Sequence, residues 1–173
     1  MSVVSLLGKY SSELVSADTA TKDTLIVRPI FFSNSAMNQL SLKLVAWIPS
    51  GEKARKRQFL YQNMVEVYGP SFDDIERQNL LLNTDGMLTS KLSKLLQTAL
   101  HAVSNDLKGV YGRVDTANKT YFIKQDTKNK PVRGSLVDEN CGYLVFQDLH
   151  PWLIAFSVQD ATENAQPDLL EQC

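Results

Sequence analysis

Residues 89–108 carry the strongest structural signal in the sequence, an apolar stripe with helical spacing. The apolar side chains recur mainly three and four residues apart, which places them on one face of a helix: Leu88, Leu92, Leu95, Leu96, Ala99, Leu100, Val103 and Leu107. Thr89 or Ser90 is expected to cap the start, and Gly109 to end the helix. Because such a helix is stabilised mainly by packing, the chain needs a second layer that covers the stripe.

Strand-like segments before this helix supply part of that layer. Residues 24–33 predict an edge strand or a broken strand, because Pro29 lacks the N–H group that a central strand needs. Residues 40–48 alternate in polarity, which predicts a half-buried strand with one face formed by Leu40, Leu42, Leu44, Ala46 and Ile48. Residues 58–68 predict a third strand, which Gly69-Pro70 is expected to end.

The rest of the chain predicts one short helix and a series of strands. Ser71 is expected to cap a helix that runs to about Leu82, with acidic residues in its first turn. After the long helix, short turns separate strand-like runs and no further helix intervenes, which predicts antiparallel pairing of residues 110–114, 120–125, 132–137, 142–147 and 152–159. The predicted fold class is α+β, an antiparallel sheet packed by one long and one short helix.

The composition fits a single globular domain between two tails. The chain has 173 residues, of which 43% are hydrophobic and 21% charged. We expect a flexible N-terminal arm at 1–23, a domain at 24–159 and a flexible acidic tail at 160–173. A secretory signal and a membrane-spanning run are not expected, and Cys141 and Cys173 are expected to be reduced thiols, so a cytoplasmic location is predicted.

No residue pattern points to catalysis or to a cofactor. His101 lies in the predicted long helix and is expected to be a packed or solvated side chain. Cys141 and His150 are close in sequence, whereas a catalytic thiol and its base usually come from distant segments. No group of residues has the spacing of metal ligands. The sequence therefore predicts a non-enzyme without metal, cofactor or small-molecule substrate.

Charge is segregated along the chain although the net charge is only −1. Residues 160–173 contain four acids and no bases, so the remaining chain has 18 basic against 15 acidic residues. The clustered bases are candidates for binding phosphates, anionic lipid or a nucleocapsid: Lys53, Arg55, Lys56 and Arg57 in one loop, and Lys119, Lys124, Lys128, Lys130 and Arg133 around a second. The alternative is that both loops are only solvated.

Two tryptophans and the N-terminal arm are candidates for protein interfaces. Trp47 falls on the more polar face of its predicted strand, and Trp152 follows a turn. Exposed tryptophans often mark interfaces, although a second core face would explain them equally well. The arm begins with apolar residues that could dock on a neighbour: Val3, Val4, Leu6 and Leu7.

The order of elements in the second half of the chain resembles a known family. The long helix, the segment Gly109–Arg113, the strand Lys119–Lys124 and the pair Gly142–Phe146 and Trp152–Asp160 are similar to the core of rhabdovirus matrix proteins. The length is closest to the plant-infecting cytoplasmic branch. The Lys-rich N-terminal segment and Pro-rich budding motif of the animal viruses are missing, which leaves residues 53–57 as the basic substitute.

This resemblance implies a structural protein of virion assembly. Such a protein self-associates, binds the nucleocapsid and lines the anionic membrane surface, in the host cytoplasm and in the virion. The alternative is a small cytosolic adaptor or chaperone-like module that binds one protein through the face bearing Trp47.

Overall fold

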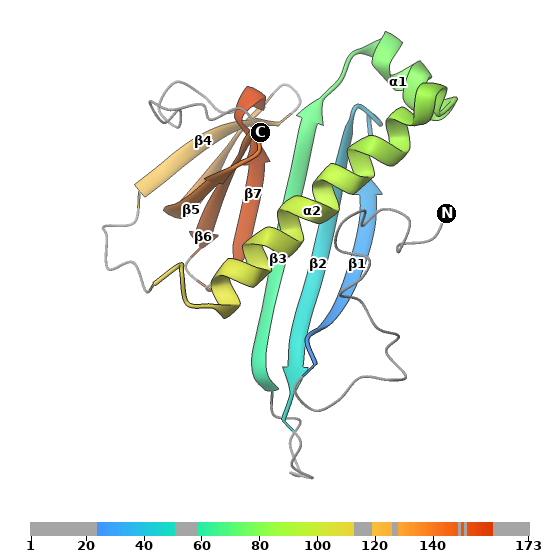
Figure 1. The fold of residues 1–173 in the computed structure, drawn as a ribbon. Helices are drawn as coiled ribbons and strands as arrows, with labels where there is room; N and C mark the ends of the chain where they lie inside the picture. The colour runs from blue at the N-terminus through green and yellow to red at the C-terminus, as the bar shows by residue number, and fades with distance from the viewer. Residues whose placement is uncertain are drawn as a thin grey trace.

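The computed structural model describes residues 24–50, 59–112, 119–125, 128–148, 150 and 152–160. Seven strands form one sheet, and the long helix α2 (Met87–Leu107) lies diagonally across β2 and β3 (Figure 1). The strands follow the order β1 (Ile26–Ser33), β2 (Gln39–Pro49), β3 (Phe59–Ser71), β7 (Leu153–Ser157), β6 (Tyr143–Asp148), β5 (Lys128–Asn140) and β4 (Lys119–Gln125). The predicted α+β class is confirmed, and β1 is an edge strand as Pro29 predicts.

One pair of strands contradicts the predicted antiparallel sheet. β3 and β7 run parallel, whereas every other neighbouring pair of described strands is antiparallel. The sequence spacing constrains strands that are joined by short turns, but α2 and three strands separate β3 from β7 along the chain. The parallel pair joins the antiparallel strands β1–β3 to the antiparallel strands β4–β7 within one sheet.

The main hydrophobic core lies between α2 and the sheet. The alternation predicted for β2 is confirmed, because Leu42, Leu44 and Ala46 are fully buried against α2. Of the stripe predicted for the helix, Leu95, Leu96, Ala99 and Val103 are buried, together with Ala102, which was not predicted. Leu107, at the end of the predicted stripe, is exposed. Each fully buried leucine side chain contributes roughly 2 kcal/mol relative to exposure, so this layer is the main source of stability.

A second apolar cluster lies on the opposite side of the sheet. It is formed by residues that alternate with the first core along β3, β6 and β7: Tyr68, Leu144, Phe146 and Phe156. The rings of Tyr68 and Phe156 stack with centroids 4.9 Å apart. Both faces of β6 and β7 are therefore buried, as is the Tyr68 end of β3, whereas β1 and β2 are buried mainly on the face that packs against α2.

Helix α2 ends as predicted but begins earlier. Gly109 has a positive φ of 72° and donates its N–H to the carbonyl of Asp106, and Val110 donates to Asn105. Val110 thus belongs to the end of the helix, and no strand forms in the described part of 110–114. At the start, neither Thr89 nor Ser90 caps the helix, and Asn83 Oδ1 instead accepts the N–H of Leu88 at 3.2 Å.

The predicted end of β3 at Gly69-Pro70 is wrong, because the strand continues to Ser71. A β-carbon at position 69 would lie 2.9 Å from the carbonyl oxygen of Leu40, so a glycine is required inside this strand. Because Ser71 belongs to β3, it does not cap the short helix as predicted. The N-cap of α1 (Asp74–Leu81) is Asp73. Asp73 Oδ1 accepts the N–H of Glu76 at 2.8 Å. The described part of the chain also contains two 3-10 turns, η4 (Thr84–Gly86) and η5 (Val158–Asp160).

The hairpin of β5 and β6 also differs from the prediction. Its turn is Cys141-Gly142, both with positive φ, whereas the strand predicted at 132–137 ends before Asp138. A register shift between Leu136 and Asp138 lets β5 continue to Asn140. Asp160, which the sequence assigns to the tail, is buried in η5.

Candidate functional site

The face of β1–β3 that points away from α2 is the first candidate site. Cross-strand pairing places on it Ile26, Arg28, Ile30 and Phe32 of β1, Ser41, Lys43, Val45 and Trp47 of β2, and Gln62, Met64, Glu66 and Tyr68 of β3. We call it the open face, because α2 lies on the other side of the sheet (Figure 1).

The open face presents large apolar side chains to solvent. Ile30 and Phe32 are 44% and 40% exposed, and Trp47 is partly exposed. The ring of Phe32 meets that of Tyr68 edge-on, with centroids 6.4 Å apart, so part of the face is preorganised. The structure places Trp47 opposite the helix-covered core, as the alternation of β2 predicts. Ile30 and Phe32 are neighbours on this face of β1, whereas Trp47 pairs with Ile26 near the other end of the strand. Neighbouring exposed apolar side chains are typical of protein interfaces.

A closed polar network interrupts the apolar surface. Lys43 Nζ lies 2.9 Å from Glu66 Oε1, and the Tyr68 hydroxyl donates to Glu66 Oε2 at 2.8 Å. Burial alone would raise the pKa of Glu66, but the hydrogen bonds from Lys43 and Tyr68 and the charges of Lys43 and Lys130 outweigh it and lower this pKa. The carboxylate thus stays ionised and paired, and the network leaves no net charge at the centre of the face.

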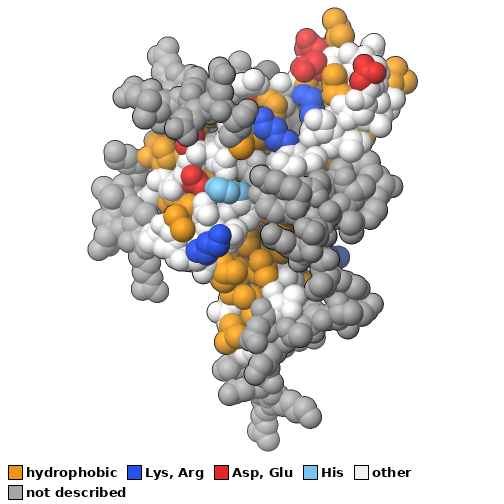
Figure 2. Space-filling view, viewed as in Figure 1, with side chains coloured by type: hydrophobic (Ala, Val, Ile, Leu, Met, Phe, Trp, Pro, Cys, Tyr) orange, Lys and Arg blue, Asp and Glu red, His pale blue; other side chains and the backbone are white. Residues whose placement is uncertain are grey.

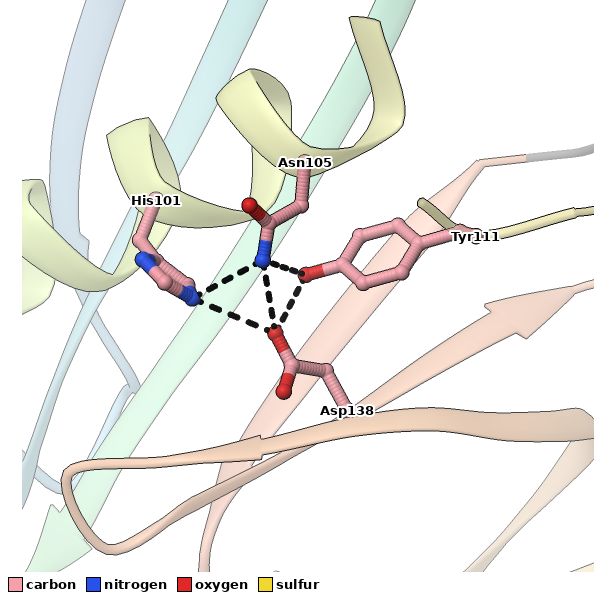
Figure 3. Close-up of polar contacts among 4 residues, drawn as sticks. All are labelled: His101, Asn105, Tyr111 and Asp138. Carbon is pink, nitrogen blue, oxygen red and sulfur yellow. Dashed lines mark hydrogen bonds and ion pairs between the residues drawn. The ribbon is translucent and has the colours of Figure 1, made fainter. Parts of the chain in front are cut away.

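A polar cluster at the C-terminal end of α2 is the second candidate site (Figure 3). Asp138 Oδ2 accepts the hydroxyl of Tyr111 at 2.6 Å and the amide of Asn105 at 3.2 Å, and it lies 3.3 Å from His101 Nε2. The Asn105 amide nitrogen is also 2.9 Å from His101 Nε2. All these groups converge on one carboxylate oxygen, which ties the helix to β5.

A matching contact ties the same helix end to β3. Asp106 Oδ2 accepts the hydroxyl of Tyr61 and the amide of Asn63, both at 2.7 Å. Burial, together with the neighbouring aspartates, raises the pKa of Tyr61 and of Tyr111 well above the ordinary value, so both phenols remain proton donors. Donors that stay protonated and hydrogen-bonded stabilise the contact between the helix and the sheet. We call the Asp138 cluster and the Asp106 contact the two clamps on α2, because each holds the end of the helix to a strand.

The sequence does not indicate either clamp, because their members are far apart in the chain. The exposed pair Ile30 and Phe32 could have been found from the alternation within residues 24–33, where Val27 and Phe31 pack against the core. The signal for the clamps is weaker, since isolated aspartates and tyrosines have no characteristic spacing.

The predicted basic residues are only partly described. Lys130 and Arg133 are exposed on β5, and Lys130 Nζ lies 5.0 Å above the ring of Tyr68. The backbone of Lys128 lies in β5, while its side chain falls outside the described part, as do the whole residues Lys53, Arg55, Lys56 and Arg57.

The other predicted interface residues have separate positions. Trp152 is 47% exposed beside the ring of His150, with centroids 5.6 Å apart, and it is not on the open face. The arm residues lie outside the described part of the chain: Val3, Val4, Leu6 and Leu7. Cys141 is disulfide-bonded, so the expectation of a reduced thiol at this position is wrong.

Raising the pH above 10 is expected to destabilise the fold through buried tyrosines. Burial raises the pKa of Tyr61, Tyr68, Tyr111 and Tyr143, and nearby carboxylates raise it further. Below pH 10 both states keep these protons, and above it the unfolded chain releases them first. The free energy of unfolding therefore falls by at most about 1.4 kcal/mol per tyrosine for each pH unit above 10. Urea unfolding at pH 8 and pH 11 measures it, and absorbance at 295 nm should rise together with unfolding; early ionisation in the folded protein would contradict the burial.

No described helix is both long and apolar enough to cross a bilayer, and no group of three or more described His, Cys, Asp or Glu residues is placed to hold a metal ion. Comparisons of the chain with protein-family models, with curated proteins and with solved structures found no match to any of them.

Proposed function

We propose that this protein is a non-enzymatic assembly protein that self-associates through its open face. The partly exposed apolar surface formed by Ile30, Phe32 and Trp47 is the observation that supports it. Ile30 and Phe32 belong to the edge strand β1, whose outer backbone groups have no strand partner in the described sheet. Apolar side chains on a rigid sheet, beside an unpaired edge, favour contact with another protein surface over chemistry on a small molecule.

We further propose that assembly is of the viral matrix type. In this proposal the exposed bases of β5, Lys130 and Arg133, and the loop at 53–57 contact an anionic membrane or nucleocapsid. The apolar arm residues Val3, Val4, Leu6 and Leu7 would dock on a neighbouring copy. Many weak contacts of this kind become strong only when copies are linked, which suits a protein whose net charge is near zero.

Substituting Ile30 and Phe32 together with serine is expected to weaken self-association at least about tenfold, since each lost apolar contact costs on the order of 1 kcal/mol. Both side chains are well exposed, so the fold should tolerate the change. Sedimentation velocity over a series of concentrations gives the dissociation constant. The unchanged protein should form larger species as its concentration rises.

The matched control replaces Ile75 and Leu82, which are 71% and 79% exposed outside the open face. This control should associate like the unchanged protein. Vesicles that contain phosphatidylserine test the membrane part, because matrix-type binding should occur at low salt and decline as salt rises. A chain that stays monomeric at high concentration, or an open-face variant that associates normally, would refute the proposal.

The second candidate function is a protein-binding adaptor that uses the same face. Trp47 favours it, because a partly exposed tryptophan on a rigid strand is a typical anchor for a single partner. An adaptor would remain monomeric at every concentration and would not bind the vesicles. Sedimentation and vesicle binding therefore distinguish the two candidates.

A further inference from the structure

A cavity of about 500 Å³ lies where α2 passes over the ends of β3, β6 and β7. Much of its lining is apolar, from Leu40, Pro70, Phe72, Leu95, Tyr143 and Val158. Its volume is in the range of ligand sites in proteins. It is separate from the open face, which lies on the other side of the sheet from α2.

The cavity is also lined by two lysines of α2. Lys91 Nζ is 3.6 Å from Glu76 Oε1, which offsets part of its charge. Lys94 is exposed with its Nζ 5.8 Å from the ring centroid of Tyr143, and no described carboxylate is paired with it. Figure 2 shows basic and apolar side chains together near the end of α2 closest to α1. The cavity therefore fits a ligand that combines apolar groups with negative charge.

The described chain ends at the wall of this cavity. Val158 lines it and donates its N–H to the carbonyl of Gly142, another lining residue, at 2.9 Å. Asp160 is buried, accepts the N–H of Ser71 at 3.3 Å, and adds to the burial that raises the pKa of Tyr143. These contacts fix the point from which residues 161–173 continue.

The sequence of residues 161–173 has the chemistry that the cavity requires. It contains no lysine or arginine, and its two adjacent leucines lie between acids, in the order Asp168, Leu169, Leu170 and Glu171. Nine extended residues reach about 30 Å, so Leu169 can return to the cavity from Asp160. Cys141, which precedes Gly142, is disulfide-bonded, and the other cysteine of the sequence is Cys173. A bond between the two would hold the end of the segment at the same wall.

We propose that the cavity is a binding site for an acidic peptide with adjacent leucines, and that its ligand is the chain's own segment 161–173. Leu169 and Leu170 enter the apolar cavity, and the flanking carboxylates face Lys91 and Lys94. Because the short connection gives the segment an effective concentration of about 1 mM, modest contacts suffice for docking. This site is independent of self-association through the open face.

Lysine acetylation of the full-length chain, followed by mass spectrometry in reducing buffer, tests the docking without any disulfide. Substituting Leu169 and Leu170 with serine should speed modification of Lys94 by about fivefold or more, which corresponds to roughly 1 kcal/mol of docking. Lys108, exposed at the other end of α2, should react equally in both proteins. Serine at Gln166 and Gln172 is the matched control, and it should leave the protection of Lys94 intact.

A labelled peptide of residues 161–172 gives a second readout. It should bind the double-serine variant, whose cavity is free, and bind the unchanged protein at least about tenfold more weakly. Lys94→Glu should reduce this binding, and Lys108→Glu should not. Equal acetylation of Lys94 in all variants would overturn the proposal. Protection of Lys94 that grows with protein concentration would also overturn it, because the ligand would then be the segment of a second copy. Binding of a long-chain fatty acid, and not of the peptide, would overturn it as well.

Discussion

Replacing Gly134 with alanine is expected to lower the free energy of unfolding by about 3 kcal/mol, the upper end of the usual cost of overpacking. Gly134 is buried in β5, between Lys119 of β4 and Asp148 of β6. A β-carbon there would overlap the carbonyl oxygen of Gln147 and would lie 3.2 Å from the Cα of Asp148. Both are backbone atoms, so no side-chain rotation can relieve the clash, and β5 must move away from β6.

Urea unfolding monitored by circular dichroism measures this loss, and Gly112→Ala is the matched control. Gly112 is exposed, and no atom lies within 4 Å of the β-carbon that alanine would add. The control should change stability by less than about 0.5 kcal/mol. A Gly134→Ala protein as stable as the control would show that β5 and β6 do not pair in the register described.

Local patterns predicted the elements, and long-range pairing is where prediction from sequence failed. The period-two alternation of β2 assigns Leu42 and Leu44 to the buried face, because a strand exposes alternate residues to opposite sides. Gly109 ends α2 because few other residues adopt its backbone conformation. The parallel contact of β3 with β7 has no local signal, since α1, α2 and three other strands lie between these two strands in the sequence. Gly69 shows the same limit: the sequence predicts that it ends the strand, but it lies inside β3, where a β-carbon would clash with the backbone of Leu40.

The candidate sites were predictable only where they follow a strand pattern. Trp47 could be assigned to the face away from the helix-covered core because one alternation fixes both faces of β2. The clamps at the end of α2 could not be assigned, because Asn105 is 33 residues from Asp138 and Asp106 is 45 residues from Tyr61. Their contacts depend on where the helix crosses the sheet. The cavity was missed for the same reason, since Lys94 and Val158 meet only in the folded chain.

Substituting Asp106 with leucine is expected to cost about 3 kcal/mol of stability, because two donors on β3 would lose their acceptor. Asn63 is 7% exposed, and its amide and the hydroxyl of Tyr61 both donate to Asp106 Oδ2 at 2.7 Å. A buried donor without a partner costs about 1–3 kcal/mol, whereas an exposed one returns to water. Asp74→Ala, which removes an exposed aspartate paired with Arg77, should cost less than about 1 kcal/mol.

A double-mutant cycle separates the clamp from the general effect of losing an aspartate. In Tyr61→Phe the donor is gone, so adding Asp106→Leu should cost about 1 kcal/mol less than it does in the unchanged protein. The two changes act on one hydrogen bond, and their effects should therefore not add. Strict additivity in urea unfolding would mean that Tyr61 and Asp106 do not interact in solution. Coupling of the expected size would show that the end of α2 is held to β3 by this contact, and that the helix and the strand form one cooperative unit.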